Sequence, residues 1–131
     1  LQEVMAQLEL AGVDFAGTVL KPNMVVPGKK SGQHASPEEV AEATVSVLRA
    51  ALPDSLAGIA FLSGGQSPEE ATTNLAAMQK HDTPWPLTFS FGRALVDPAL
   101  KAWHGDPDLI SAGQQALFSR VEPNSAALVN A

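Results

Sequence analysis

Residues 59–70 read Ile-Ala-Phe-Leu-Ser-Gly-Gly-Gln-Ser-Pro-Glu-Glu, and this stretch predicts a strand that passes through a short loop into a helix. The first four residues are apolar, which is typical of a short buried strand. Ser67 is a favourable N-cap, a proline occupies the first helical position, and Glu70 stands at the spacing of a capping box. A strand that leads directly into a helix is the building unit of parallel α/β folds.

The same helix-start signal occurs a second time, at Ser36-Pro37-Glu38-Glu39. Apolar residues follow it at helical spacing as far as residue 51, and Leu52-Pro53 ends the run. The recurrence indicates two equivalent strand-to-helix units. It does not indicate a solenoid, because the intervening loops differ in length and the signal occurs in only two copies.

The rest of the chain extends this alternation in both directions. Periodicity and turn residues predict an amphipathic helix over residues 1–11, a strand over 14–21, a loop over 27–32, a strand over 87–91, helices over 94–103 and 107–120, and an irregular tail over 123–131. Three strands alternating with helices predict the α/β class, with a parallel sheet covered by helices. The 131 residues would suffice for one domain, but a complete (β/α)8 barrel typically needs about 250. The sequence also begins at Leu1 rather than Met, inside the predicted first helix, so we expect a fragment of a longer chain.

The charge balance argues against a nucleic-acid partner. Eight Lys and Arg stand against fourteen Asp and Glu, for a formal net charge of -6, whereas phosphate-backbone binding needs a basic surface. The pairs Lys29-Lys30 and Lys80-His81 are interpreted as solvated loop and helix ends. No apolar stretch approaches the roughly 18 residues of a membrane helix, and no signal segment is evident at the N-terminus. We expect a cytoplasmic protein without a membrane partner.

The sequence offers no metal-binding pattern. The chain has no cysteine, which excludes disulfides and thiolate zinc sites. His34, His81 and His104 are far apart, and none has a second histidine at metal-ligand spacing. The predicted site therefore contains no metal.

Lys21 ends the strand predicted over residues 14–21 and precedes Pro22, which keeps it in extended backbone. A lysine attacks a carbonyl only as the neutral amine, and an apolar environment favours that neutral form. Lys21 is therefore a candidate for forming a Schiff base with a carbonyl substrate. The alternative, which is the commoner role of a strand-end lysine, is a solvated surface lysine.

Two loops that follow predicted strands could bind an anion. Ser63-Gly64-Gly65 can present backbone amides and a hydroxyl to a phosphate, although such a loop is more often a simple turn. Gly92-Arg93 offers the fixed fork of donors that suits phosphate, and the alternative is that Arg93 pairs with an acid such as Asp97. In α/β barrels, reactive residues lie at the carboxyl ends of strands and phosphate sites follow strands seven and eight.

Three segments, in this order, closely resemble class I fructose-bisphosphate aldolase. They are Gly-Thr-Val-Leu-Lys-Pro-Asn-Met-Val at residues 17–25, Phe-Leu-Ser-Gly-Gly-Gln-Ser at 61–67 and Leu-Thr-Phe-Ser-Phe-Gly-Arg-Ala-Leu at 87–95. The likeness continues through residues 99–103 and, more loosely, 124–127. It implies the C-terminal part of a TIM (β/α)8 barrel over residues 1–131, with strands six to eight and the C-terminal helices present and the N-terminal part of the barrel absent.

The resemblance also implies the chemistry. Lys21 would form the imine with dihydroxyacetone phosphate or fructose 1,6-bisphosphate, and Ser63, Gly64, Gly92 and Arg93 would hold the phosphate of the ketose. Neither a metal nor another cofactor is needed, because the protonated imine polarises the substrate. The full-length enzyme would be a cytoplasmic lyase of glycolysis and gluconeogenesis, acting as a homo-oligomer on a phosphorylated sugar.

The chain departs from the family in two respects. The acid and base carboxylates of the family lie on earlier strands, so no acid or base is assigned here, and the glutamates at positions 38, 39, 69 and 70 are interpreted as helix-start residues. The chain has no tyrosine, so the terminal-tyrosine chemistry of the animal enzymes is not supported. We expect this fragment alone to be inactive. The alternative function is a non-catalytic half-barrel that binds phosphate or assembles with another chain.

Overall fold

The computed structural model describes residues 1–129, and helix α2 (Pro37–Ala51) begins at the predicted serine cap. The amide of Glu39 donates to Ser36 Oγ at 3.2 Å, and the amide of Ser36 donates to Glu39 Oε2 at 2.7 Å. The Ser36 amide, and after it the Ser36 hydroxyl, hold the pKa of Glu39 below its ordinary value of 4.5. The predicted capping box is thus confirmed, and it fixes the start of α2 locally.

Helix α3 (Pro68–Met78) begins with the same pair of reciprocal bonds. The amide of Glu70 donates to Ser67 Oγ at 3.1 Å, and the amide of Ser67 donates to Glu70 Oε2 at 2.7 Å. Both helices pack against each other and bury an apolar stripe, in which Leu75 and Met78 of α3 are fully buried. The signal in the sequence was sufficient to place both helix starts.

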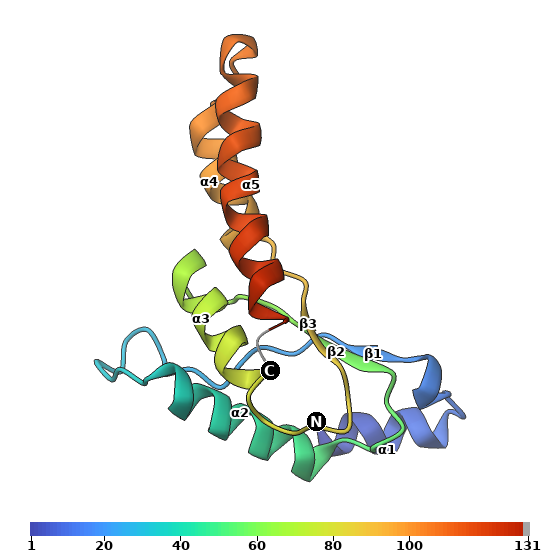
Figure 1. Ribbon diagram of the computed structural model, residues 1–131. Coiled ribbons are helices and arrows are strands. Elements are labelled where there is room, and N and C mark those ends of the chain that lie inside the picture. The colour runs from blue at the N-terminus through green and yellow to red at the C-terminus, as the bar shows by residue number, and fades with distance from the viewer. Residues whose placement is uncertain (130–131) are drawn as a thin grey trace.

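The sheet contains strands β1 (Val19–Leu20), β2 (Gly58–Phe61) and β3 (Leu87–Phe89), in that spatial order. Both strand pairs are parallel. Parallel strands direct their carboxyl ends to one edge of the sheet, so the residues that follow the three strands are brought together. The predicted α/β arrangement is confirmed (Figure 1).

The first strand is much shorter than predicted. A strand was expected over residues 14–21, but residues Phe15–Gly17 form a 3-10 turn and β1 has only two residues. Asp14 causes the difference, since its Oδ1 accepts from the amide of Ala16 at 2.9 Å and caps the turn. The turn is fixed to the sheet because the amide of Ala57 donates to the carbonyl of Phe15 at 3.0 Å.

The core lies between the central strand and the helices α2 and α3. Ile59 and Phe61 of β2 have no exposed surface. Trp85, at the entrance to β3, is also buried, and its Nε1 donates to the carbonyl of Pro53 at 2.8 Å. Helix α1 (Gln2–Leu10) adds Met5 to this core. The central strand is therefore the best-buried element of the sheet, whereas β1 and β3 are its edges.

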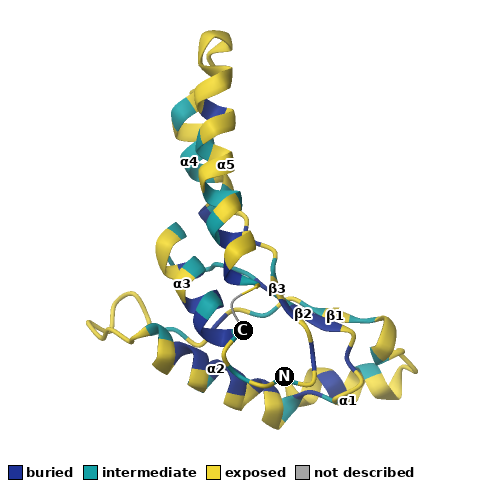
Figure 2. Ribbon diagram, in the orientation of Figure 1, coloured by how far each residue is buried: buried dark blue, intermediate teal, exposed yellow. Residues whose placement is uncertain are grey.

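Helices α4 (Arg93–Trp103) and α5 (Ile110–Ala127) form a hairpin that projects away from the sheet (Figure 1). The short 3-10 turn η2 (Pro107–Leu109) connects them. A Cβ built on Gly113 would lie only 2.8 Å from Trp103 Cβ, so glycine permits the close approach of the two helices. Most of the hairpin surface is exposed, as Figure 2 shows.

Helix α5 continues beyond the predicted boundary. Residues 123–131 were expected to be irregular, but α5 extends to Ala127 with Pro123 inside it, and residues 130–131 lie outside the described residues. Proline removes one helical hydrogen bond. The fully buried Asn124 offsets this loss, because its Nδ2 donates to the Arg120 carbonyl at 2.6 Å and its Oδ1 accepts from Thr72 of α3 at 2.9 Å. This anchor to α3 keeps the chain helical.

Candidate active site

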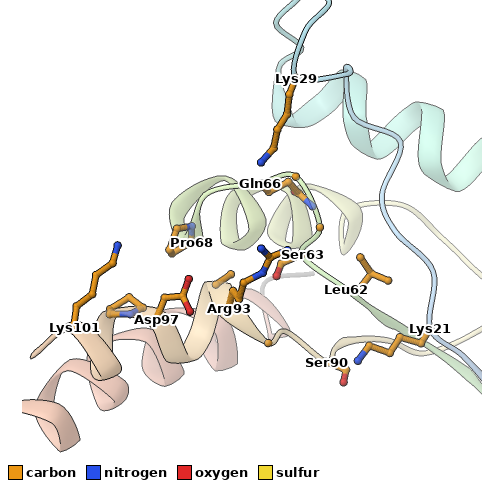
Figure 3. Close-up of a pocket in the computed structure, with 15 residues that line it drawn as sticks. Lys21, Lys29, Leu62, Ser63, Gln66, Pro68, Ser90, Arg93, Asp97 and Lys101 are labelled. Atoms are coloured by element: carbon orange, nitrogen blue, oxygen red, sulfur yellow. The ribbon is translucent and has the colours of Figure 1, made fainter. Parts of the chain in front are cut away.

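The five residues singled out in the sequence line one cavity of about 350 Å³ at the carboxyl edge of the sheet (Figure 3). Lys21 follows β1, Ser63 and Gly64 follow β2, and Gly92 and Arg93 follow β3. Ladder-like bonds continue beyond the strands, since the amide of Leu62 donates to the Pro22 carbonyl at 2.9 Å. The parallel topology therefore unites an amine with two loops suited to anions.

Lys21 is held by its neighbours, although its side chain is exposed. Two residues further on, Asn23 Nδ2 donates to the carbonyl of Gly64 at 3.2 Å. The amide of Val25 donates at 2.9 Å to Oγ1 of Thr44, a buried residue of α2. The expected apolar environment of Lys21 is not found among the described residues, since β1 is an edge strand and Lys21 is exposed. What the structure fixes is the backbone position of Lys21 relative to the glycine loop.

Residues 63–66 form a compact loop, which we call the glycine loop. The amide of Gln66 donates to the carbonyl of Ser63 at 3.1 Å and closes the turn. Gly65 has a φ of 84°, a left-handed conformation that favours glycine. The side chain of Gln66 accepts from Nδ2 of the buried Asn74 at 2.8 Å, which ties the loop to α3. The loop is thus held from both sides, by Asn23 and by Asn74.

Arg93 is the first residue of α4, and it is exposed to the cavity. Gly92 is the N-cap of this helix and provides no side-chain cap, so the first amides of α4 remain available to an anion. The alternative interpretation paired Arg93 with Asp97. Both residues line the cavity, but the ion pairs within residues 1–129 are Lys80–Glu38 and Arg120–Glu69, and neither involves Arg93.

The sequence interpretation missed several residues of the cavity wall, among them Lys29, Ser90 and Lys101. Asp97 also lines the cavity, although it was named only as a possible partner of Arg93. Asp97 and Lys101 could have been found, since they follow Arg93 at intervals of four along the predicted helix and share its face. Ser90 directly follows β3. Lys29 was interpreted as a solvated loop residue, and nothing in the sequence indicates that the loop brings it to the cavity.

The described residues contain no candidate metal centre and no membrane-spanning helix. Within residues 1–129, no group of three or more His, Asp or Glu side chains is placed to hold a metal ion. In the same range no helix is long and apolar enough to span a bilayer. The chemistry open to the site, on the residues present, is attack by an amine and binding of an anion.

Comparison with known proteins decides the family. The family model described as "Fructose-bisphosphate aldolase class-I" matches residues 1–131, the whole chain. The chain belongs to the class-I fructose-bisphosphate aldolase family. The expected resemblance is therefore confirmed.

Individual relatives agree with this assignment. The chain is 49% identical over 125 residues to the chloroplastic fructose-bisphosphate aldolase 2 of Pisum sativum, a match that covers 95% of this chain and 36% of the pea protein. It is 54% identical over 113 residues to the cytosolic fructose-bisphosphate aldolase 5 of Arabidopsis thaliana, which covers 85% of this chain and 31% of that protein. The chain thus spans about a third of the length of these relatives.

A solved aldolase confirms the fold class. The fructose-bisphosphate aldolase of Plasmodium falciparum, crystallised with TRAP and a small-molecule inhibitor, matches with a TM-score of 0.93 at 39% identity. The match covers 98% of this chain and 38% of the Plasmodium chain. The three parallel strands and their helices therefore form part of an α/β barrel of the aldolase type.

Proposed function

We propose that residues 1–131 are the C-terminal barrel segment, strands six to eight and the terminal helices, of a metal-independent, Schiff-base fructose-bisphosphate aldolase. This enzyme cleaves fructose 1,6-bisphosphate reversibly to dihydroxyacetone phosphate and glyceraldehyde 3-phosphate. One observation carries the proposal: the Lys21 amine shares a cavity with the glycine loop and Arg93. A ketose phosphate needs both a nucleophile for its carbonyl and an anion site for its phosphate.

In the proposed reaction the neutral amine of Lys21 attacks the keto carbonyl, and loss of water from the adduct, with uptake of one proton from solvent, gives a protonated imine. The imine nitrogen then accepts the electron pair released when the neighbouring carbon-carbon bond breaks. The departing carbon leaves as the aldehyde, and the proton of its hydroxyl passes to a base on an earlier strand of the full-length enzyme. Ser63, the backbone of Gly64 and Gly92, and the Arg93 guanidinium bind the phosphate and hold the carbonyl within reach of Lys21. Asp97 is the carboxylate of the cavity wall, and we assign it no proton-transfer role.

Reductive trapping tests the role of Lys21. In the protein that contains this chain, borohydride reduction with dihydroxyacetone phosphate should attach a triose to the peptide that carries Lys21. Lys21→Arg should abolish the adduct, because arginine stays protonated and cannot attack. Lys30→Arg is the matched control, since Lys30 is not among the residues that line this cavity, and it should leave the adduct intact. An adduct found only on Lys29, Lys30 or Lys101 would contradict the assignment.

A second candidate function is a phosphate-binding half-barrel without catalysis. The exposure of Lys21 on an edge strand favours it, because an imine-forming lysine is typically activated in an apolar pocket or beside another cation, and the described residues place no apolar pocket around Lys21. An equilibrium assay separates the two functions. Binding of a sugar phosphate with no adduct after reduction would support the non-catalytic module, whereas a trapped adduct would support the aldolase.

The cellular location and assembly of the protein are further predictions. Relatives carry both chloroplastic and cytosolic names. The proposed cytoplasmic location follows the cytosolic relatives, and fractionation of cells that express the full-length protein would test it.

The proposed homo-oligomer can be tested by sedimentation of the same protein.

A further inference from the structure

Lys29 lies over the glycine loop from a segment that the sequence interpretation treated as solvent-facing. It lines the same cavity as Lys21 and Arg93. Its Cε is 4.0 Å from the position that a Cβ on Gly65 would occupy. In Figure 3 its amine points from a separate loop toward Gln66 and the glycine loop, on the side opposite α4. Two cations, Arg93 and Lys29, thus reach the loop from different elements.

The loop that carries Lys29 is shaped by its own hydrogen bonds. The carbonyl of Gly28 accepts from the amide of Ser31 at 2.9 Å and from the Ser31 hydroxyl at 2.7 Å. This turn places Lys29 and Lys30 at its corner, and only Lys29 is among the residues of the cavity wall. Glu70, which lines a second cavity together with Lys29, is engaged in the capping box of α3. Within residues 1–129 no ion pair involves Lys29.

The charge of a bound phosphate can be compared with the charges of the cavity wall around Lys29. A phosphate monoester carries a charge of about -1.5 to -2 at neutral pH. Arg93 supplies one positive charge at the start of α4, Asp97 one turn further along opposes it, and Lys101 lies another turn away, while Lys21 is assigned to the carbonyl of the substrate. The chain as a whole is acidic, with a formal net charge of -6, so positive charge for an anion has to come from the cavity wall itself. A second cation beside the glycine loop would match the phosphate dianion.

We infer that Lys29 binds the phosphate of the ketose as this second cation and determines the preference for phosphorylated over unphosphorylated substrates. The inference rests on the proposed function and adds a binding residue to it. Lys29 acts as a point charge at the end of a flexible stem, whereas Arg93 fixes the orientation of the phosphate with its planar fork.

Comparison of Lys29→Gln with Lys30→Gln tests the inference in the protein that contains this chain. Both substitutions remove one positive charge from the same turn. A difference in KM between the two variants therefore reports the contact that Lys29 alone makes with the cavity. Lys29→Gln should raise KM for fructose 1,6-bisphosphate about two- to fivefold, the upper part of the range of an exposed charge contact, with kcat nearly unchanged. Lys30→Gln should match the wild type, and Lys29→Arg should restore most of the loss. Cleavage of fructose 1-phosphate should respond as the bisphosphate does, and that of unphosphorylated fructose should not respond.

The outcomes separate this inference from the proposed function. If the wild type cleaves the bisphosphate and the two Gln variants have equal KM, the inference is overturned while the aldolase assignment stands. If the wild type does not cleave the bisphosphate, the proposed function fails. The role of Lys29 is then tested separately, by titrating the protein with inorganic phosphate and monitoring binding by NMR. Weaker phosphate binding by Lys29→Gln than by Lys30→Gln would support the role, and equal binding would overturn it.

Discussion

Single residues at the ends of three strands define the site, and Arg93 has the most specific geometry among them. It opens α4 at an N-terminus without a side-chain cap, and it faces the glycine loop across the cavity. Its guanidinium fork and the free amides of α4 can bind the same anion. The contribution of Arg93 should therefore depend on whether the substrate carries a phosphate.

We expect Arg93→Ala to lower kcat/KM for fructose 1,6-bisphosphate about 10- to 100-fold, the effect of losing a charged hydrogen-bonding group. The slow reaction with unphosphorylated fructose should change little. Steady-state kinetics on both substrates in the full-length protein measures the contrast. Equal losses on the two substrates, with an unchanged circular dichroism spectrum, would show that Arg93 has a structural role instead.

The sequence could predict the site residues that adjoin a strand. Lys21, Ser63 and Arg93 each lie within a few residues of a strand end, and parallel strands bring such residues together whatever the details of packing. Lys29 could not be predicted, because the path of its loop depends on the turn between Gly28 and Ser31 rather than on any periodic pattern. The exposure of Lys21 depends on what packs beyond β1, which local sequence does not encode.

At the scale of elements, the capping boxes make the helix starts independent of the rest of the fold. Ser36→Ala should lower the free energy of unfolding by about 1 kcal/mol, because the amide of Glu39 loses its acceptor. Ser46→Ala, an exposed change within the same helix, should stay within about 0.5 kcal/mol of the wild type. Urea denaturation near pH 7 measures both. Equal stabilities of the two variants would mean that the cap contributes nothing.

The carboxylate half of the same box should make stability depend on pH. The Ser36 amide lowers the pKa of Glu39, so folding favours the ionised form. Its contribution is complete above the ordinary pKa of 4.5 and is lost as the pH falls through the lowered value in the folded state. Glu39→Gln should therefore flatten the acid limb of a stability profile. A variant with an unchanged acid limb would contradict the assignment of this linkage.

The two capped helices were predicted, whereas one strand was lost to a competing local cap and one helix was extended by a distant contact. The capped helices α2 and α3 carry their start signals within four residues. The strand expected over residues 14–21 gave way to a turn that Asp14 caps, a competition that apolar character alone does not reveal. The last helix was expected to end at residue 120 and to be followed by an irregular tail, but Asn124 binds α3 and the helix continues through Pro123.

At the scale of the whole molecule, the described chain has two open sheet edges and an apolar groove on the α4–α5 hairpin. The edges are β1 and β3. The groove, about 270 Å³, lies on the hairpin between Leu100, Trp103, Ile110 and Leu117. Open edges and exposed apolar surface favour association. Lys21 at such an edge remains in contact with water.

We expect the purified 131-residue chain to show no measurable cleavage of fructose 1,6-bisphosphate. No proton-transfer carboxylate is assigned near Lys21, so an imine formed there would lack a partner to move protons. A coupled assay against a full-length class-I aldolase at equal concentration measures this. Cleavage at a comparable rate would contradict the prediction, and recovery of activity on mixing with a separately produced N-terminal barrel half would support it.

The parallel order of the sheet has a consequence for how the chain folds. Neither strand pair can close through a tight turn, because a complete helix lies between β1 and β2 and another between β2 and β3. Closing such long loops is entropically costly before any pairing bond forms. The helices, which carry their own caps, can form without that cost. In pulse-labelling hydrogen exchange, the amides of α2 should thus gain protection early in refolding. The amides that form the hydrogen bonds between the two-residue β1 and β2 should gain protection last.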